Sequence, residues 1–246
     1  MSGPQHQITL YFDLVSSFSF LCFATLLTHP LFTQKNVVVT FIPVSIGVII
    51  RQSGNSPPII PGRKSAKQDY LVRDFARRAR VLGVPVLKGL PKGFPGGFDS
   101  KPLLRILLVL QQDFGEEVYV GAIEKFYKAL WQDGVDFTAP TISKTLLSSL
   151  NLPGNPELNS IIEKAESEEI TELLNRNTQE VLGQGGFGLP WIKAHPLLVG
   201  LIIAVNTKGE TDTWWGVDQL TQVAGFLELD WPEGAIEKDP KIRHML

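Results

Sequence analysis

The chain has 246 residues, of which 43% are hydrophobic and 20% are charged, and its 23 Lys and Arg stand against 25 Asp and Glu for a formal net charge of −2. This length predicts one globular unit that can carry an inserted second lobe. The charge balance argues against a protein held on nucleic acid by bulk charge, and no apolar run reaches the roughly 20 residues of a membrane-spanning helix. We therefore expect neither nucleic acid nor a membrane as a partner.

A single cysteine, Cys22, excludes an intramolecular disulfide and a metal site built from several cysteines. The N-terminus lacks the basic segment, apolar core and small-residue cleavage site of a secretory signal. Residues 243–246 match the Ser-Lys-Leu type of peroxisomal address poorly. We predict an intracellular protein, in the first place cytoplasmic, with mitochondrial or peroxisomal placement left open.

The first elements predict a βαβ unit. Residues 7–12 and 36–44 are rich in β-forming and apolar side chains, as in strands covered on both faces. Residues 16–27 between them are apolar, begin with serine and end before His29-Pro30, which predicts a buried helix joining two parallel strands. The Pro and Gly of residues 53–62 predict a loop that leaves this first lobe.

The middle of the chain has helical periodicity. Apolar side chains recur at helical spacing in four segments, which are residues 71–82, 119–130, 142–150 and 170–181. A fifth segment, residues 102–110, is apolar on all sides, which predicts a helix buried within the lobe. Residues 67–182 are therefore predicted to form an all-helical domain.

The β character returns after residue 190. Residues 201–205 and 211–215 flank residues 206–210 as a predicted hairpin, and a last helix follows. Asp218 stands at the N-cap or in the first turn of that helix. The fold class is thus α/β: residues 1–66 and 183–235 form a thioredoxin-like domain, the helical domain is inserted in its middle, and residues 236–246 are a C-terminal tail.

The junction between the first strand and the first helix is the first candidate site, because a helix N-terminus presents unpaired N–H groups and a partial positive charge. Thioredoxin-like oxidoreductases carry Cys-x-x-Cys there, but this chain carries Ser16 and Ser19. Thiol–disulfide exchange by the protein's own cysteines is therefore excluded, and Cys22, inside the apolar helix, is predicted to be a packed thiol.

The Ser16 hydroxyl can instead donate a hydrogen bond to the thiolate of a bound small thiol. Such a bond to a charged group contributes roughly 1.5–3 kcal/mol, and about 1.4 kcal/mol equals one pKa unit. One donor together with the helix N-terminus would then lower the pKa of the thiol by about one to two units. The alternative, that Ser16 only caps the helix, stays open on the sequence.

Five short segments in this order resemble the kappa-class glutathione transferases and the related 2-hydroxychromene-2-carboxylate isomerases. They are residues 11–19 (YFDLVSSFS), 53–58 (SGNSPP), 67–74 (KQDYLVRD), 186–190 (GFGLP) and 216–218 (GVD). The resemblance runs from about residue 7 to 231. It implies a DsbA-like thioredoxin fold with a helical insertion, glutathione as co-substrate, no metal, and a homodimer.

Site residues follow from this resemblance position by position. Ser16 matches the catalytic serine that acts on the glutathione sulfur. Pro190 resembles the family's cis-proline, and Leu189 before it would pair its backbone with the cysteinyl part of glutathione.

Three more positions match residues at the ligand. Asn55 matches the asparagine of the Gly-Asn-x-Pro-Pro loop, Lys67 the lysine that borders the ligand, and Asp218 the aspartate that receives the γ-glutamyl ammonium. Each also has a structural alternative: a turn residue for Asn55, a solvated charge for Lys67 and a helix cap for Asp218.

The chain departs from the family in several places. Phe18 stands where relatives carry tyrosine, and Val217 and Gln219 stand where relatives carry serine and arginine, which removes a hydroxyl donor and a cation. Residues 193–200 are longer than the family pattern. That segment either enlarges or caps a hydrophobic substrate pocket, or it is an extended strand edge.

These observations predict a glutathione-dependent transferase or isomerase that activates the thiolate for attack on a hydrophobic electrophile. The alternative is a non-catalytic protein of the same fold that binds an apolar ligand in the same cleft. The departures at Val217 and Gln219 support this alternative.

Overall fold

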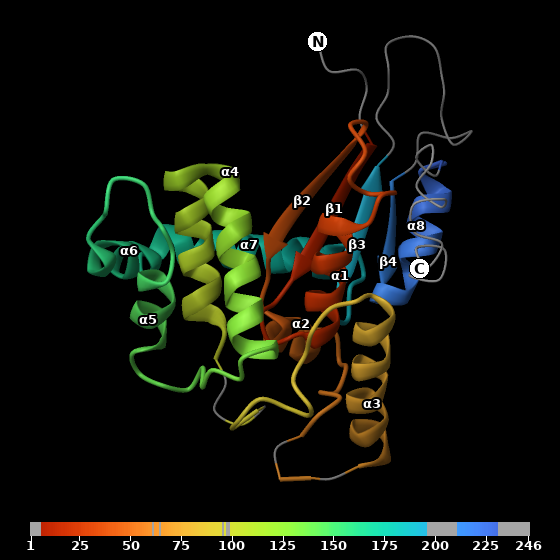
Figure 1. Ribbon diagram of the computed structural model, residues 1–246, viewed down its shortest axis with the longest axis horizontal. Helices are drawn as coiled ribbons and strands as arrows, with labels where there is room; N and C mark the ends of the chain where they lie inside the picture. The colour runs from red at the N-terminus through yellow and green to blue at the C-terminus, as the bar shows by residue number, and fades with distance from the viewer. Residues whose placement is uncertain are drawn as a thin grey trace.

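The computed structural model describes residues 6–60, 62–63, 65–94, 96, 99–195 and 211–230. A four-stranded mixed sheet in the order β2-β1-β3-β4 stands at the centre of this part of the chain (Figure 1). The strands are β1 (His6–Phe12), β2 (Val37–Pro43), β3 (Trp191–His195) and β4 (Asp212–Trp215). β1 is parallel to β2 and antiparallel to β3, and β3 is antiparallel to β4.

Helices surround this sheet (Figure 1). In chain order they are α1 (Ser17–Thr28), α2 (Ile46–Gln52), α3 (Ala66–Val81), α4 (Lys101–Trp131), α5 (Ile142–Ser148), α6 (Leu158–Ala165), α7 (Glu168–Gly183), the short 3-10 helix η1 (Val217–Gln219) and α8 (Leu220–Phe226). β1, α1 and β2 confirm the predicted parallel βαβ unit.

Both faces of the sheet are buried, and the alternation of side chains along β1 decides which residue faces which layer. Leu10 of β1 and its register partner Ile192 of β3 belong to the main hydrophobic core, to which α1 and α4 contribute. Tyr11 and its partner Trp191 belong to a second cluster with Val181 of α7. Figure 1 shows α1 on one side of the sheet and α7 on the other.

α4 is the longest helix and combines two helices that the sequence predicts separately. Its 31 residues contain Gly115, whose φ of 81° and ψ of 178° are not helical and mark a kink. The segment before the kink buries Leu103, Leu104 and residues 106–110, which agrees with a helix apolar on all sides. No helix of the described residues is both long enough and apolar enough to span a bilayer.

The structure differs from the sequence prediction at two elements. α2 was not predicted, because Ser45 to Ile50 is short and apolar and has no helical periodicity of its own. Residues 193–200, the excursion beyond the family pattern, begin as strand: residues 193–195 belong to β3, where Ala194 faces the core and the Lys193 side chain contacts Glu180. These three residues extend a strand, as the second alternative states, but β3 lies between β1 and β4 and not at the edge of the sheet.

Other parts of that prediction lie outside the described residues. These are residues 196–200 of the excursion, the predicted strand at residues 201–205, the turn at residues 206–210 and the tail at residues 236–246. The second strand of the predicted hairpin is confirmed as β4, but its described partner is β3.

The predicted helical domain includes helices of two kinds. α4, α5 and α6 pack against one another to one side of the sheet (Figure 1). α7 packs against α4 and α6 as well, but it also contacts β2 and α2, so it covers the sheet directly. The division into two domains stays a prediction.

Candidate active site

Ser16 lies at the junction between β1 and α1, as the sequence predicts. It is the N-cap of α1, with φ −88° and ψ 104°, and it is only 7% exposed. Its Oγ accepts hydrogen bonds from the backbone N–H of Ser19 at 3.2 Å and from the Ser19 hydroxyl at 2.8 Å. The positions that would hold the two cysteines of a redox-active thioredoxin fold are therefore two serines in hydrogen-bond contact.

The capping role and the donor role of Ser16 are compatible. A hydroxyl has two acceptor lone pairs and one donor hydrogen. Both contacts with Ser19 use the oxygen as acceptor, which leaves the hydroxyl hydrogen of Ser16 for a ligand. Ser16 is thus the N-cap of α1 and remains a candidate donor, so the alternative that it only caps the helix stays open.

Two aromatic side chains of α4 fix the turn that carries Ser16. The Tyr127 hydroxyl donates to the carbonyl of Asp13 at 3.1 Å, and the Trp131 indole N–H donates to the carbonyl of Leu14 at 2.9 Å. Both rings are buried, and they come from more than a hundred positions further along the chain. The sequence gives only a weak signal for them, because aromatic residues at helical spacing are typical of any core.

The carboxylate of Asp13 lies directly beneath this turn. It is fully buried and accepts hydrogen bonds from the backbone N–H groups of Ile46 at 2.9 Å and Val15 at 3.2 Å. Burial raises its pKa to about 6 against these bonds, which lower it. Asp13 therefore ties the start of α1 to the start of α2.

None of the histidines that the structure describes is placed to act as a base toward Ser16. His29 lies at the opposite end of α1, His6 begins β1, and His195 ends β3, where its Nδ1 is 2.9 Å from the Thr211 hydroxyl. Cys22 is buried, and its burial raises the pKa of its thiol. The prediction of an inert packed cysteine agrees with this placement.

The described residues also hold no group of three or more candidate metal ligands among His, Cys, Asp and Glu. The groups that this junction offers to a ligand are the hydroxyl of Ser16 and the N-terminus of α1.

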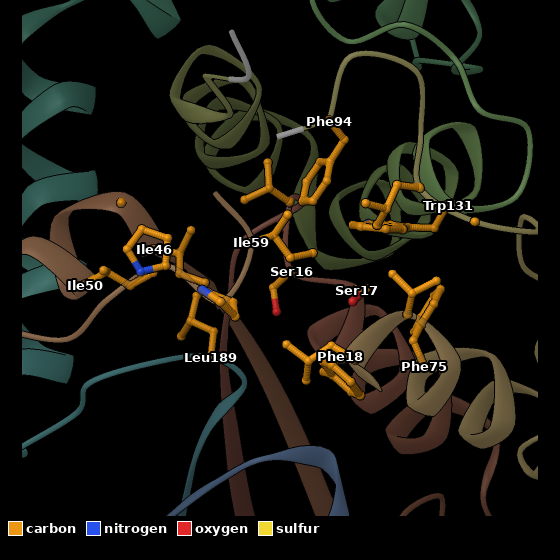
Figure 2. A pocket seen from close by; sticks show the side chains of 18 residues that line it. Ser16, Ser17, Phe18, Ile46, Ile50, Ile59, Phe75, Phe94, Trp131 and Leu189 are labelled. Atoms are coloured by element: carbon orange, nitrogen blue, oxygen red, sulfur yellow. The ribbon is translucent and has the colours of Figure 1, made fainter. Parts of the chain in front are cut away.

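Ser16 opens into an apolar cavity of about 260 Å³. Figure 2 shows its hydroxyl in the middle of a ring of side chains, with Ile59, Leu189 and Phe18 around it and Phe94, Trp131 and Phe75 beyond. Among the described residues that line this cavity, only Ser16 and Ser17 carry a hydroxyl. We call this space the apolar cavity.

A second compartment of about 440 Å³ adjoins the apolar cavity, and we call it the polar compartment. Both are lined by Phe18, Ile46, Ile50, Pro58, Leu71 and Leu189. The five residues that the family resemblance implies at the ligand all line the polar compartment: Asn55, Lys67, Leu189, Pro190 and Asp218. Residues that are up to 163 positions apart in the chain thus meet in one space next to Ser16.

The loop residues of the polar compartment are tied to one another. The Asn55 side chain donates to the carbonyl of Phe187 at 2.8 Å and accepts from the N–H of Ser56 at 2.7 Å. The N–H of Gly216 donates to the carbonyl of Pro190 at 3.1 Å. Asn55 thus follows a turn at residues 53–54 and ties two loops together, and its role toward a ligand stays a prediction.

The peptide bond between Leu189 and Pro190 is cis, as the resemblance implies. Leu189 lines both the apolar cavity and the polar compartment. The indole of Trp215 packs against Gly188 in this loop. A Cβ on Gly188 would lie 2.7 Å from the indole Nε1. Only glycine fits this position without a shift of the indole.

Asp218 lies in η1 and caps neither η1 nor α8, whose N-caps are Gly216 and Gln219. Its exposed carboxylate accepts a hydrogen bond from the Gln219 side chain at 2.9 Å. A Cβ on Gly216, which has φ of 109°, would lie 2.6 Å from the carboxylate oxygen. The helix-cap alternative is therefore wrong, and Asp218 remains a candidate for binding a cation.

Lys67 is exposed near the start of α3. Its side chain lines the polar compartment. Residues 193–195, which were predicted as part of a segment shaping the substrate pocket, line neither compartment.

A mixed sheet in which the N-terminus of α1 faces a cis-proline loop defines a thioredoxin-like protein. The model of the DSBA-like thioredoxin domain matches residues 7–228, so the chain belongs to this family. The fold class and the family resemblance predicted from the sequence are confirmed.

Several relatives cover nearly the whole chain. Glutathione S-transferase kappa 1 of Caenorhabditis elegans is 25% identical over 229 residues, which are 92% of each chain. The structure of a 2-hydroxychromene-2-carboxylate isomerase has a TM-score of 0.68 at 19% identity and covers 90% of this chain and 94% of that one. The disulfide reductase DsbM of Pseudomonas aeruginosa with GSH has a TM-score of 0.57 at 14% identity and covers 90% and 97%.

Proposed function

We propose that this chain is a glutathione-dependent transferase or isomerase. Glutathione occupies the polar compartment, and its thiolate at Ser16 attacks a hydrophobic electrophile in the apolar cavity. The observation that carries this proposal is the meeting of the two compartments beside the Ser16 hydroxyl, with Phe18, Ile46 and Leu189 shared by both linings. A transfer reaction between two ligands needs their reacting atoms to be held close together in the right orientation, which two adjoining spaces can provide.

The lining of the polar compartment supports glutathione as its ligand. This tripeptide carries one ammonium, two carboxylates and a thiol. The compartment offers the carboxylates of Asp74 and Asp218 and the cations of Lys67 and Arg78. Relatives of this chain include kappa-class glutathione transferases and a disulfide reductase whose structure was determined with GSH.

Ser16 is the donor that stabilises the thiolate. Its hydroxyl hydrogen is free of the contacts with Ser19, and the N-terminus of α1 adds partial positive charge at the same point. Both interactions favour the charged form of the sulfur, so the pKa of the bound thiol falls and the thiolate fraction at neutral pH rises. A covalent role for Ser16 would need a base within hydrogen-bond reach.

The thiolate then forms a bond from sulfur to an electrophilic carbon. In a transfer the electron pair leaves with a leaving group or passes along a conjugated system and picks up a proton from water. In an isomerisation the addition is reversible: rotation about the former double bond is followed by expulsion of the thiolate. The aromatic rings of Phe18, Phe75, Phe94 and Trp131 in the cavity favour an apolar, aromatic electrophile.

Thermal unfolding with and without glutathione tests the proposal. A ligand present at 100 times its dissociation constant adds about 2.7 kcal/mol of stability. We expect a rise in Tm at millimolar glutathione and turnover of an aromatic model electrophile that depends on glutathione. No rise in Tm would contradict the proposal.

The non-catalytic alternative is favoured by one contact: Gln219, where relatives carry arginine, bonds the Asp218 carboxylate. A protein of this kind would be stabilised by an apolar aromatic ligand but not by glutathione, and it would turn over no electrophile. The same unfolding experiment therefore separates the two functions. The homodimer and the intracellular, cytoplasmic placement stay predictions.

A further inference from the structure

One face of α3 forms a wall of the polar compartment. The residues on this face recur at helical spacing, and they are Lys67, Leu71, Asp74 and Arg78. Positions separated by three, four and seven residues share one side of a helix. The sequence alone predicts a solvated helix face here, because Asp69 and Asp74 are interleaved with the basic patch of Arg73, Arg77, Arg78 and Arg80.

Arg78 is held in place within this wall. Its Nε donates to the Asp74 carboxylate at 2.7 Å, and Asp74 is mostly buried, with a side chain only 15% exposed. This contact leaves the donors of both terminal guanidinium nitrogens for a ligand. Because Arg77 also contacts Asp74, two cations share one carboxylate, and a net positive charge remains.

The two cations of the wall stand far apart. Lys67 and Arg78 are separated by 11 positions, which is about 16 Å along a helix axis at 1.5 Å per residue. An extended chain of three residues spans at most about 11 Å, and the flexible side chains of Lys67 and Arg78 can cover the difference. In the view of Figure 1 the C-terminal end of α3 is the end nearer to α8. Arg78 lies in the last turn of α3 and Lys67 near its start, and both line the same compartment as Asp218. We therefore assign Arg78 to the Asp218 end of the compartment.

We propose that Arg78 binds the α-carboxylate of the γ-glutamyl residue of glutathione and thereby replaces the cation missing at Gln219, while Lys67 binds the glycyl carboxylate. This inference rests on glutathione as the ligand of the polar compartment. The ammonium and the α-carboxylate of the γ-glutamyl residue share one carbon atom, so the group that binds the carboxylate has to lie near Asp218. A planar guanidinium fixed at Nε suits such a carboxylate, because it can donate two parallel hydrogen bonds.

The test is calorimetric titration of wild type and Arg78→Gln with three probes. The probes are glutathione, its analogue with the γ-glutamyl α-carboxylate converted to an amide, and its analogue with the glycyl carboxylate converted to an amide. We expect Arg78→Gln to weaken the binding of glutathione and of the glycyl amide at least about tenfold, because a hydrogen-bonded charge is lost. The γ-glutamyl amide should bind wild type and Arg78→Gln equally. Lys67→Gln should show the converse pattern.

Arg77→Gln is the matched control. It removes the same charge from the same helix and a contact with the same Asp74, but the Arg77 side chain is 57% exposed and lines neither compartment. Its affinity for glutathione should stay within about twofold of wild type, since exposed ion pairs contribute little. Arg78→Lys, which keeps a charge, provides a second variant if Arg78→Gln unfolds.

The outcomes separate this proposal from the proposed function. Equal glutathione affinity of wild type and Arg78→Gln overturns the role of Arg78 and leaves glutathione binding intact. An equal loss for all three probes also overturns it, since the effect would then not depend on the carboxylate. Failure of wild type to bind glutathione overturns the proposed function together with this assignment.

Discussion

The two compartments of the cleft differ in the charge of their linings. Among the described residues no charged side chain lines the apolar cavity, and its aromatic side chains continue into the hydrophobic core. The polar compartment is lined by the charged side chains of Lys67, Asp74, Arg78 and Asp218, and hydrogen bonds such as Asn55 to Phe187 hold its loop residues together. We therefore expect changes in the cavity to alter stability and the choice of electrophile, and changes in the polar compartment to alter ligand affinity.

The largest expected effect is the loss of stability on replacing Trp131, and Trp215 provides the comparison. Trp131 of the apolar cavity is 1% exposed, donates to the Leu14 carbonyl and packs edge-on against Phe75 and Phe94. Trp131→Ala should lower the free energy of unfolding by about 3–5 kcal/mol in urea titrations. Trp215→Ala in the polar compartment, where the side chain is 49% exposed, should cost less than about 1.5 kcal/mol. Equal losses for the two variants would refute the comparison.

Asp13 lies beneath the point where the compartments meet, and it gives a pH-dependent effect. Its pKa is about 6 in the folded chain and near 3.8 in the unfolded chain. Between these values the folded chain binds more protons than the unfolded chain, so the stability that Asp13 contributes falls as the pH rises from 4 to 6 and then stays constant. Two pKa units correspond to about 3 kcal/mol.

The measurement compares urea unfolding of wild type and Asp13→Asn across this pH range, which cancels the contributions of the other carboxylates. The stability of wild type relative to Asp13→Asn should fall by about 3 kcal/mol between pH 4 and 6.5. A difference that does not change with pH would show that Asp13 is ionised throughout in the folded chain.

The sequence predicts the polar compartment better than the apolar cavity, and the reason is physical. Asn55, Lys67 and Asp218 stand in short motifs whose loop and helix-start geometry is local, so a resemblance can identify them one by one. Phe94 and Trp131 line the cavity only because α4 and the loop before it pack against α1 and α3. Nothing in the residue type or spacing separates such a cavity-lining aromatic residue from an ordinary core residue.

The same reasoning explains the elements that the sequence prediction missed. β1 in the middle of the sheet and β2 at its edge are apolar strands of seven residues each, and their pattern is unambiguous even though the sequence predicts both as covered on both faces. β3 has five residues and includes Lys193 and His195, so it reads as a strand only when its pairing with β1 is known. α2 has seven residues, which are too few to show helical periodicity.

Ser16 lines the apolar cavity next to Phe18, which both compartments share, and a neighbouring serine supplies the control. Ser16→Ala should raise the apparent pKa of bound glutathione by about one to two units, because one hydrogen bond to the thiolate is lost. Ser17→Ala should leave this pKa unchanged, since Ser17 lines the cavity but does not cap α1. Ultraviolet titration of the bound thiolate measures both variants, and an identical pKa for wild type and Ser16→Ala would remove Ser16 from the mechanism.

Asp218 gives the smallest expected effect and the most specific test of the polar compartment. Asp218→Asn should raise the KM for glutathione about tenfold with kcat nearly unchanged, because a charged contact remote from the sulfur contributes equally to the ground state and the transition state. Asn55 is a less direct choice, since its side chain also holds the Phe187 loop and its loss would move several lining residues. Asp212→Asn on β4 is the control, because Asp212 is exposed and lines neither compartment. A fall in kcat with an unchanged KM for Asp218→Asn would instead assign Asp218 to the chemical step and contradict its role as the anchor of the γ-glutamyl ammonium.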